Sequence, residues 1–174
     1  MSLTRIVLIM LLFFYAEGTI FYWLVPDIWT NRLVPHFALA FVLFAALYRG
    51  RHTSLFLGFA FGFLQDIVFY DKILGAHAFA GALVGYLTGL LMERRRSTML
   101  MALTMISLST FVYDNVVFFI YQVFRLNHLD YDWALVSFML PSVFLQLGFS
   151  LLIYVPARRW FENIGVKKSE EKEE

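Results

Sequence analysis

Cysteine is absent from this chain of 174 residues, and charged residues are scarce, at 16% of the sequence. Without cysteine, the chain cannot form a disulfide framework, present a thiolate nucleophile or ligate a metal ion through sulfur. A soluble domain is roughly half apolar and a quarter charged, whereas 60% of this sequence is hydrophobic. A core of this size could not bury so much apolar surface. The composition therefore excludes an ordinary soluble enzyme, a disordered protein and a nucleic-acid binder, and it indicates a lipid bilayer as the solvent.

Six long apolar stretches follow one another along the chain, separated by short polar segments. A membrane-spanning helix needs about 20 apolar residues. The stretches are continuous, whereas the strands of a membrane barrel would alternate in polarity. We therefore predict an all-α integral membrane protein with six transmembrane helices. The predicted helices cover residues 6–25, 33–48, 55–70, 74–92, 99–124 and 136–155.

The domain boundary and the orientation follow from the proline and the charges near the end of the chain. Pro156 is expected to end the last helix, and the transmembrane domain is predicted over residues 1–162. The charged tail, 163–174, is expected to be disordered. Basic residues concentrate in cytoplasmic loops, and six crossings place 11 of the 14 Lys and Arg residues on one side. Both termini are therefore predicted to be cytoplasmic.

Glycines recur at four-residue intervals on the third and fourth predicted helices. Gly58 and Gly62 lie on the third helix, and Gly81, Gly85 and Gly89 lie on the fourth. Small residues at this spacing share one helix face and let two helices approach closely within a membrane. The faces either pack within the bundle or accept a second copy or a partner helix. Packing within the bundle is the more common use, because six helices must bury several such faces.

A few polar side chains interrupt the apolar stretches, where charge is costly and tends to mark function. They are Glu17, Gln65, Asp66, Asp114 and Asn115. Four interpretations stay open: hydrogen bonds that hold the bundle or a partner together, a proton or cation relay, a pocket for a polar solute, and an aspartyl intramembrane protease. The protease would need two Asp residues that share a proton, and its Gly-x-Gly-Asp motif is missing here. Structural hydrogen bonding is the most common of these uses.

Motifs for other chemistry are absent from the sequence. It contains no Gly-x-Ser-Gly, no His-Glu-x-x-His and no P-loop, which are the patterns of serine hydrolases, zinc proteases and nucleotide binding. The four His residues lie in separate elements without metal-ligand spacing; His36 and His128 are expected near the outer membrane surface. We therefore predict no catalytic residues, no cofactor and no metal site.

The third and fourth predicted helices together resemble the rod shape-determining protein MreD family. The resemblance rests on the sequences GFAFGFLQD at 58–66, LGAHA at 74–78 and GYLTG at 85–89. The family shows a Gly-rich helix that ends in Gln-Asp or a variant, then a Leu-Gly turn and a helix containing Gly-Tyr. Chain length, six predicted spans and a basic loop after the fourth helix agree as well. The motif-bearing part covers residues 58–96.

This resemblance implies a non-enzymatic membrane scaffold of the bacterial cell-elongation complex. Such proteins bind MreC and act with MreB, RodA and a class B penicillin-binding protein in lateral peptidoglycan synthesis, which maintains rod cell shape. The implied fold is similar to that of the substrate-binding subunits of energy-coupling-factor transporters. Gln65 and Asp66 match the family motif, so they are expected to fix the geometry of two helices or to bind a partner.

The fold analogy and the buried carboxylates also support a second hypothesis, a solute-binding membrane subunit of a vitamin-type transporter. Fold analogy is a weak argument for function, and the short loops offer little to cap a pocket. The sequence leaves the oligomeric state open, including a homo-oligomer. It predicts a protein of the bacterial cell membrane, surrounded by the lipid bilayer and without nucleic-acid partners.

Overall fold

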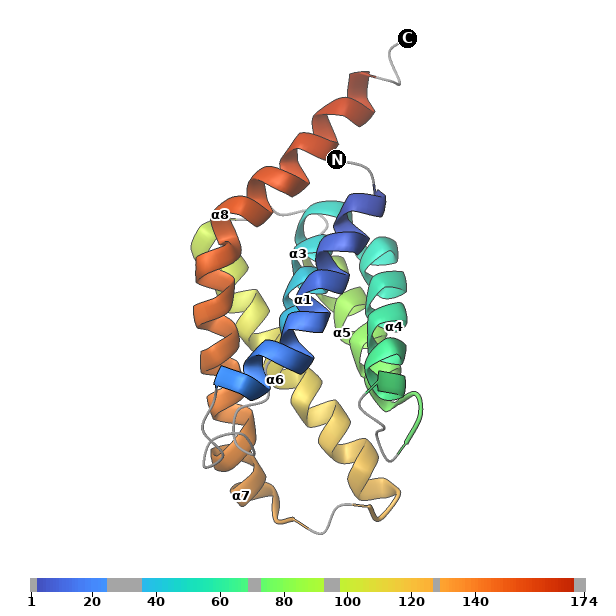
Figure 1. Cartoon of the computed structure of the whole chain (residues 1–174), viewed down its shortest axis with the longest axis vertical. Helices are drawn as coiled ribbons and strands as arrows, with labels where there is room; N and C mark the ends of the chain where they lie inside the picture. Colours follow the sequence, from blue (N-terminus) through green and yellow to red (C-terminus); the bar gives the residue numbers. More distant parts are fainter. Residues whose placement is uncertain (1–2, 25–35, 69–72, 93–97, 127–128, 171–174) are drawn as a thin grey trace.

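The computed structural model describes residues 3–24, 36–68, 73–92, 98–126 and 129–170. Within these ranges every regular element is helical, so the predicted all-α class is confirmed there (Figure 1). The long helices and two short elements, α7 and the π-helical turn η1, have these bounds: α1 Leu3–Leu24, α3 Phe37–Arg49, α4 Arg51–Val68, α5 Ala76–Met92, α6 Met99–Val123, α7 Tyr131–Ala134, η1 Leu135–Met139 and α8 Leu140–Glu170.

Two helical stretches among the described residues are long and apolar enough to cross a membrane, Met99–Val123 and Tyr131–Arg159. Three shorter helical stretches, Val7–Thr19, Phe37–Arg49 and Ala76–Met92, are also apolar. They correspond to the first, second and fourth predicted helices. A short apolar helix can be accommodated by local thinning of the bilayer.

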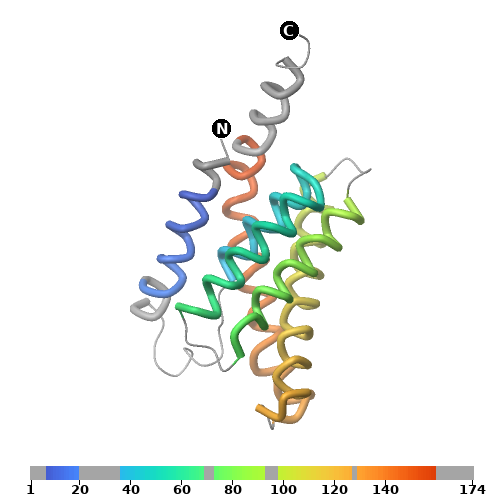
Figure 2. The backbone as a smooth tube through the Cα atoms, turned by 90° about the vertical axis from the view of Figure 1, so that its right-hand side faces the viewer, coloured from blue at the N-terminus to red at the C-terminus, as the bar shows by residue number. Residues whose placement is uncertain are grey.

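Helix α3 is the centre of the bundle. It contacts α1, α4, α5, α6 and α8, and all nine residues from Ala38 to Ala46 are buried. A helix that is apolar all round is expected to be buried on every side. The other helices therefore form a layer around α3, with α4 and α5 side by side and α1 at one edge (Figure 2).

Large apolar side chains cover the outside of the bundle. The side chains of Leu12, Phe56, Leu100, Phe144 and Leu152 are 67–79% exposed, and they come from α1, α4, α6 and α8. Monomeric soluble proteins rarely expose apolar surface on this scale. The surface of the helix bundle is therefore suited to contact with lipid.

The last helix differs from its prediction at both ends. Helical structure begins at Tyr131 instead of residue 136, and α8 passes through Pro156 and continues to Glu170. A proline inside a helix removes one backbone hydrogen bond and bends the helix, and the axis of α8 changes direction along its length (Figure 1). The expectation that Pro156 ends the helix was wrong. Residues 163–170, expected to be disordered, are helical and continue α8.

The long helices alternate in direction, and the beginning of α1 and the end of α8 lie at the same end of the bundle (Figure 1). Helix α7 lies at the opposite end. The end of the bundle that contains α7 also holds the first turns of α3 and α5. The buried carboxyl and imidazole side chains Glu17, His36, Asp66 and His77 gather there.

Candidate functional site

The glycines of α4 and α5 lie where these two helices meet. All five are buried, and a Cβ atom on any of them would come within 3 Å of backbone on the other helix. On Gly81 it would stand 2.7 Å from the carbonyl oxygen of Gly58, and on Gly85 it would stand 2.8 Å from that of Ser54. The Ser54 hydroxyl donates to the Gly85 carbonyl at 2.8 Å. The glycine face of α4 is therefore covered by α5, and that of α5 by α4.

Asp66 caps the beginning of α5 from the end of α4. The side chain is buried, and its carboxylate accepts backbone N–H groups from Gly75 at 2.9 Å and from His77 and Ala78 at 3.2 Å. Its Oδ1 also lies 2.9 Å from Nδ1 of the His77 ring. The first N–H groups of a helix have no partner within the helix and carry partial positive charge. The carboxylate satisfies three of them.

Gly75 makes this contact possible. Its φ angle is +102°, a conformation that residues with a side chain rarely adopt. The chain can therefore turn into α5 with the Gly75 N–H directed at Asp66. Asp66 belongs to the Gln-Asp sequence and Gly75 to the Leu-Gly sequence that carry the family resemblance. These two sequences are thus joined by a direct hydrogen bond.

The beginning of α3 receives polar side chains from three other helices. Glu17 of α1 is buried and accepts the backbone N–H of Ala38 at 3.3 Å. Oδ1 of Asp114, on α6, lies 3.1 Å from Nε2 of His36. Gln146 of α8 donates from Nε2 to the carbonyl oxygen of His36 at 3.0 Å. Buried carboxylates from neighbouring helices therefore cap both α3 and α5.

Gln65 and Asn115 make weaker or more local contacts. The Tyr113 hydroxyl donates to Oε1 of Gln65 at 3.4 Å, a long hydrogen bond between α6 and α4. Asn115 donates to the Phe111 carbonyl at 2.8 Å and accepts from the Tyr131 hydroxyl at 2.8 Å. Asn115 thereby connects α6 to α7.

The two aspartates have separate partners. Asp66 pairs with His77, and Asp114 pairs with His36. The proton-sharing pair that an aspartyl protease requires is not formed by these carboxylates. Among the described residues, no group of three or more His, Asp or Glu side chains is arranged to hold a metal ion.

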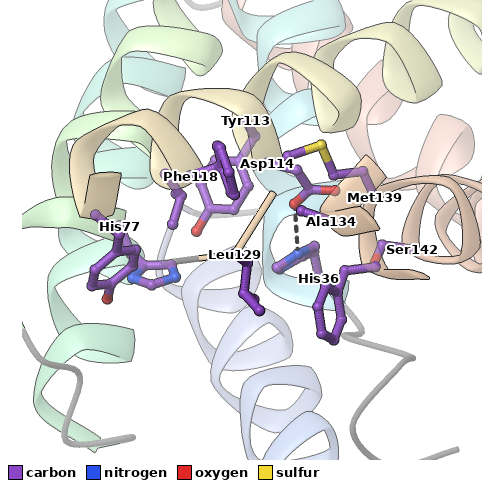
Figure 3. Close-up of a pocket in the computed structure, with 12 residues that line it drawn as sticks. His36, His77, Tyr113, Asp114, Phe118, Leu129, Ala134, Met139 and Ser142 are labelled. Atoms are coloured by element: carbon purple, nitrogen blue, oxygen red, sulfur yellow. Dashed lines mark ion pairs between the residues drawn. The ribbon is translucent and has the colours of Figure 1, made fainter. Parts of the chain in front are cut away.

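A cavity of about 510 Å³ lies between α6 and the α7–η1–α8 segment, and it reaches the first turns of α3 and α5. Figure 3 shows Asp114 and His36 facing each other at this cavity, with Ala134, Met139 and Ser142 on the α7–η1–α8 side. The polar residues that line it are His36, His77, Tyr113, Asp114, Tyr121 and Ser142. The remaining walls are apolar or aromatic, which is typical of small-molecule sites.

The sequence identified Asp66, Asp114 and Glu17 as candidates, but it did not identify their partners. His36 was expected near the outer surface, whereas its side chain is buried, with 6% exposed. Asp114 supplies the partner of this buried imidazole. Gln146 was not identified at all, although it lies in the middle of an apolar stretch. His128 lies outside the described residues.

Comparison with known proteins extends the resemblance beyond the third and fourth helices. A family model described as rod shape-determining protein MreD matches residues 2–164. The rod shape-determining protein MreD of Bacillus subtilis (strain 168) is 24% identical over 132 residues, which cover 76% of this chain and 76% of that protein. No solved structure shows a significant match.

Proposed function

Because the chain belongs to the family of the rod shape-determining protein MreD, we propose that it is a non-enzymatic membrane scaffold of the bacterial cell-elongation complex. In this role it binds MreC and supports lateral peptidoglycan synthesis, together with MreB, RodA and a class B penicillin-binding protein. The observation that carries the proposal is the family match over residues 2–164. Membership in this family supports a role in determining rod shape and a location in the bacterial membrane.

The arrangement of the helices supports a protein that crosses the membrane six times. The six long helices alternate in direction, and their outward faces carry large exposed apolar side chains. We propose that each long helix is a span and that both termini are cytoplasmic. The fold similarity to the substrate-binding subunits of energy-coupling-factor transporters stays part of this proposal.

The contacts of α4 and α5 suggest how such a scaffold keeps its shape. The glycines join the two helices along their length, and Asp66 closes the turn between them. We assign both features to the geometry of the bundle. A partner helix would then dock on another face, because the glycine faces cover each other.

Purification of the tagged full-length chain from native membranes in mild detergent tests this function. We expect MreC to copurify in a constant ratio, identified by mass spectrometry, and we expect the gene to restore rod shape to cells lacking their own MreD. A tagged multi-pass membrane protein from the same cells is the control. Recovery of an ATPase pair and a coupling subunit instead of MreC would contradict the scaffold and favour the transporter subunit.

A further inference from the structure

The cavity beside His36 and Asp114 is not needed for a scaffold. Its volume of about 510 Å³ is within the range of small-molecule sites, about 300–1,000 Å³. It is lined by α5, α6, α7, η1 and α8, and by two residues outside the helices, His36 and Leu129. With both termini cytoplasmic, it lies in the outer half of the membrane domain.

Two buried polar atoms at this cavity have unused hydrogen-bonding capacity. Among the described residues, Oδ2 of Asp114 and Nδ1 of His36 have no hydrogen-bond partner, although their neighbouring atoms, Oδ1 and Nε2, pair with each other. A buried polar atom without a partner costs free energy, so such atoms in native proteins are nearly always satisfied by protein, water or a ligand. A carboxylate oxygen can only accept a hydrogen bond. The site therefore calls for a hydrogen-bond donor.

The charges around the cavity favour a cation. Among the described residues that line it, none is Lys or Arg. Asp114 is part of the lining, Asp66 pairs with the lining residue His77, and Glu17 interacts electrostatically with both imidazoles. Three carboxyl groups and two imidazoles therefore lie at or beside the cavity. An anion would meet the Asp114 carboxylate at short range, in surroundings that screen its charge weakly.

The walls of the cavity fit an apolar body attached to that cation. The rings of Tyr113, Tyr121, Phe118 and Phe138 contribute to them, and aromatic faces attract cations as well as apolar groups. Phe138 and Met139 belong to η1, a π-helical turn. Such turns are rare and are frequently found at functional sites.

We propose that this cavity binds a small organic cation, a protonated amine with an apolar or aromatic body, and that Asp114 accepts a hydrogen bond from its ammonium group. A metal ion fits less well, because the described residues supply no group of three metal ligands and most of the wall is apolar.

Three probes that share one body and differ in charge test the proposal. They are phenethylamine, 2-phenylethanol and 3-phenylpropionate, titrated into the purified full-length protein in detergent by calorimetry, with empty micelles as the blank. We expect phenethylamine to bind about tenfold more tightly than the alcohol, the usual gain from a charge-assisted hydrogen bond. We expect 3-phenylpropionate to show no binding above the blank.

A matched pair of variants assigns the effect to the cavity. Asp114→Asn should reduce the affinity for phenethylamine about tenfold, to that of the alcohol. Asp132→Asn makes the same change at an exposed carboxylate on α7 and should leave the affinity unchanged. If Asp114→Asn does not fold, Ala134→Leu fills the cavity without removing a polar group and should abolish binding.

Equal affinity for the three probes would overturn the proposal, as would equal losses in Asp114→Asn and Asp132→Asn. Absence of phenethylamine binding to the folded protein would overturn it as well. Oδ2 of Asp114 and Nδ1 of His36 would then be assigned to hydrogen bonds with water. None of these results depends on copurification of MreC, so the ligand site and the scaffold can fail separately.

Discussion

Among single residues, Asp66 contributes most visibly to the connection between two helices. Its carboxylate accepts hydrogen bonds from three backbone N–H groups and lies within hydrogen-bonding distance of one imidazole. In a bilayer these groups find no water, so the unsatisfied N–H groups would each cost free energy. Glu17 caps the beginning of α3 in the same way, by accepting a single hydrogen bond from the backbone N–H of Ala38. The buried acidic residues of this protein are thus explained first by the helix ends they cap.

Replacement of Asp66 by alanine should destabilise the protein by about 3 kcal/mol or more, since several buried donors lose their acceptor together. Asp66→Asn should cost less, because its amide oxygen still accepts. Gln65→Ala removes only the long hydrogen bond from Tyr113 and should cost less than about 1 kcal/mol. Unfolding by SDS titration in mixed micelles measures all three. Equal stability of Asp66→Ala and Gln65→Ala would refute the capping role.

At the scale of elements, the pair formed by α4 and α5 depends on backbone contact. Any side chain at the five buried glycine positions would meet the facing helix at distances that real Cβ atoms do not adopt. Inside lipid the hydrophobic effect does not drive helices together, so their association depends on close packing of this kind. The two helices are therefore expected to separate, or to shift against each other, when a methyl group is added between them.

Gly81→Ala tests this contact, with Gly148→Ala as its control. The new methyl group at 81 would meet the Gly58 carbonyl, and such overpacking costs about 1–3 kcal/mol. Gly148 lies in α8, exposed, with no described atom within 4 Å of an added Cβ, so alanine there should stabilise the helix by about 0.5–1 kcal/mol. Thermal unfolding of both variants in the same detergent gives the comparison. A loss of stability in both would show that helix glycines matter for another reason.

The boundaries of α5 and α6 were predicted within two residues, because long apolar runs end where polar residues begin. The π-helical turn and the passage of α8 through Pro156 were not predictable from local sequence, since the rest of the helix overrides the local preference. The hydrogen-bonding partners of the site residues were not predicted from the sequence, for another reason. Gln146 and the His36 carbonyl are 110 positions apart, and only the packed bundle brings them together.

At the scale of the whole molecule, the proposed cytoplasmic orientation of both termini rests on the charges and on where the ends of the chain lie. The beginning of α1 and the end of α8 lie at one end of the bundle (Figure 1). The six-span arrangement places 11 of the 14 basic residues on that side, and basic segments stay in the cytoplasm. An odd number of crossings would instead place the two ends of the chain on opposite sides of the membrane.

The absence of cysteine from the chain allows this orientation to be measured with single introduced thiols. We expect Ser2→Cys and Ser169→Cys to resist a membrane-impermeant maleimide in intact cells and to react after permeabilisation. Asp132→Cys, on the exposed surface of α7, should react in intact cells. Each variant should still restore rod shape, which shows that the labelled protein is inserted normally. Labelling of only one terminal cysteine from outside would rule out the six-span topology, because an even number of crossings requires both ends to share one side. Labelling of both from outside would overturn the cytoplasmic orientation.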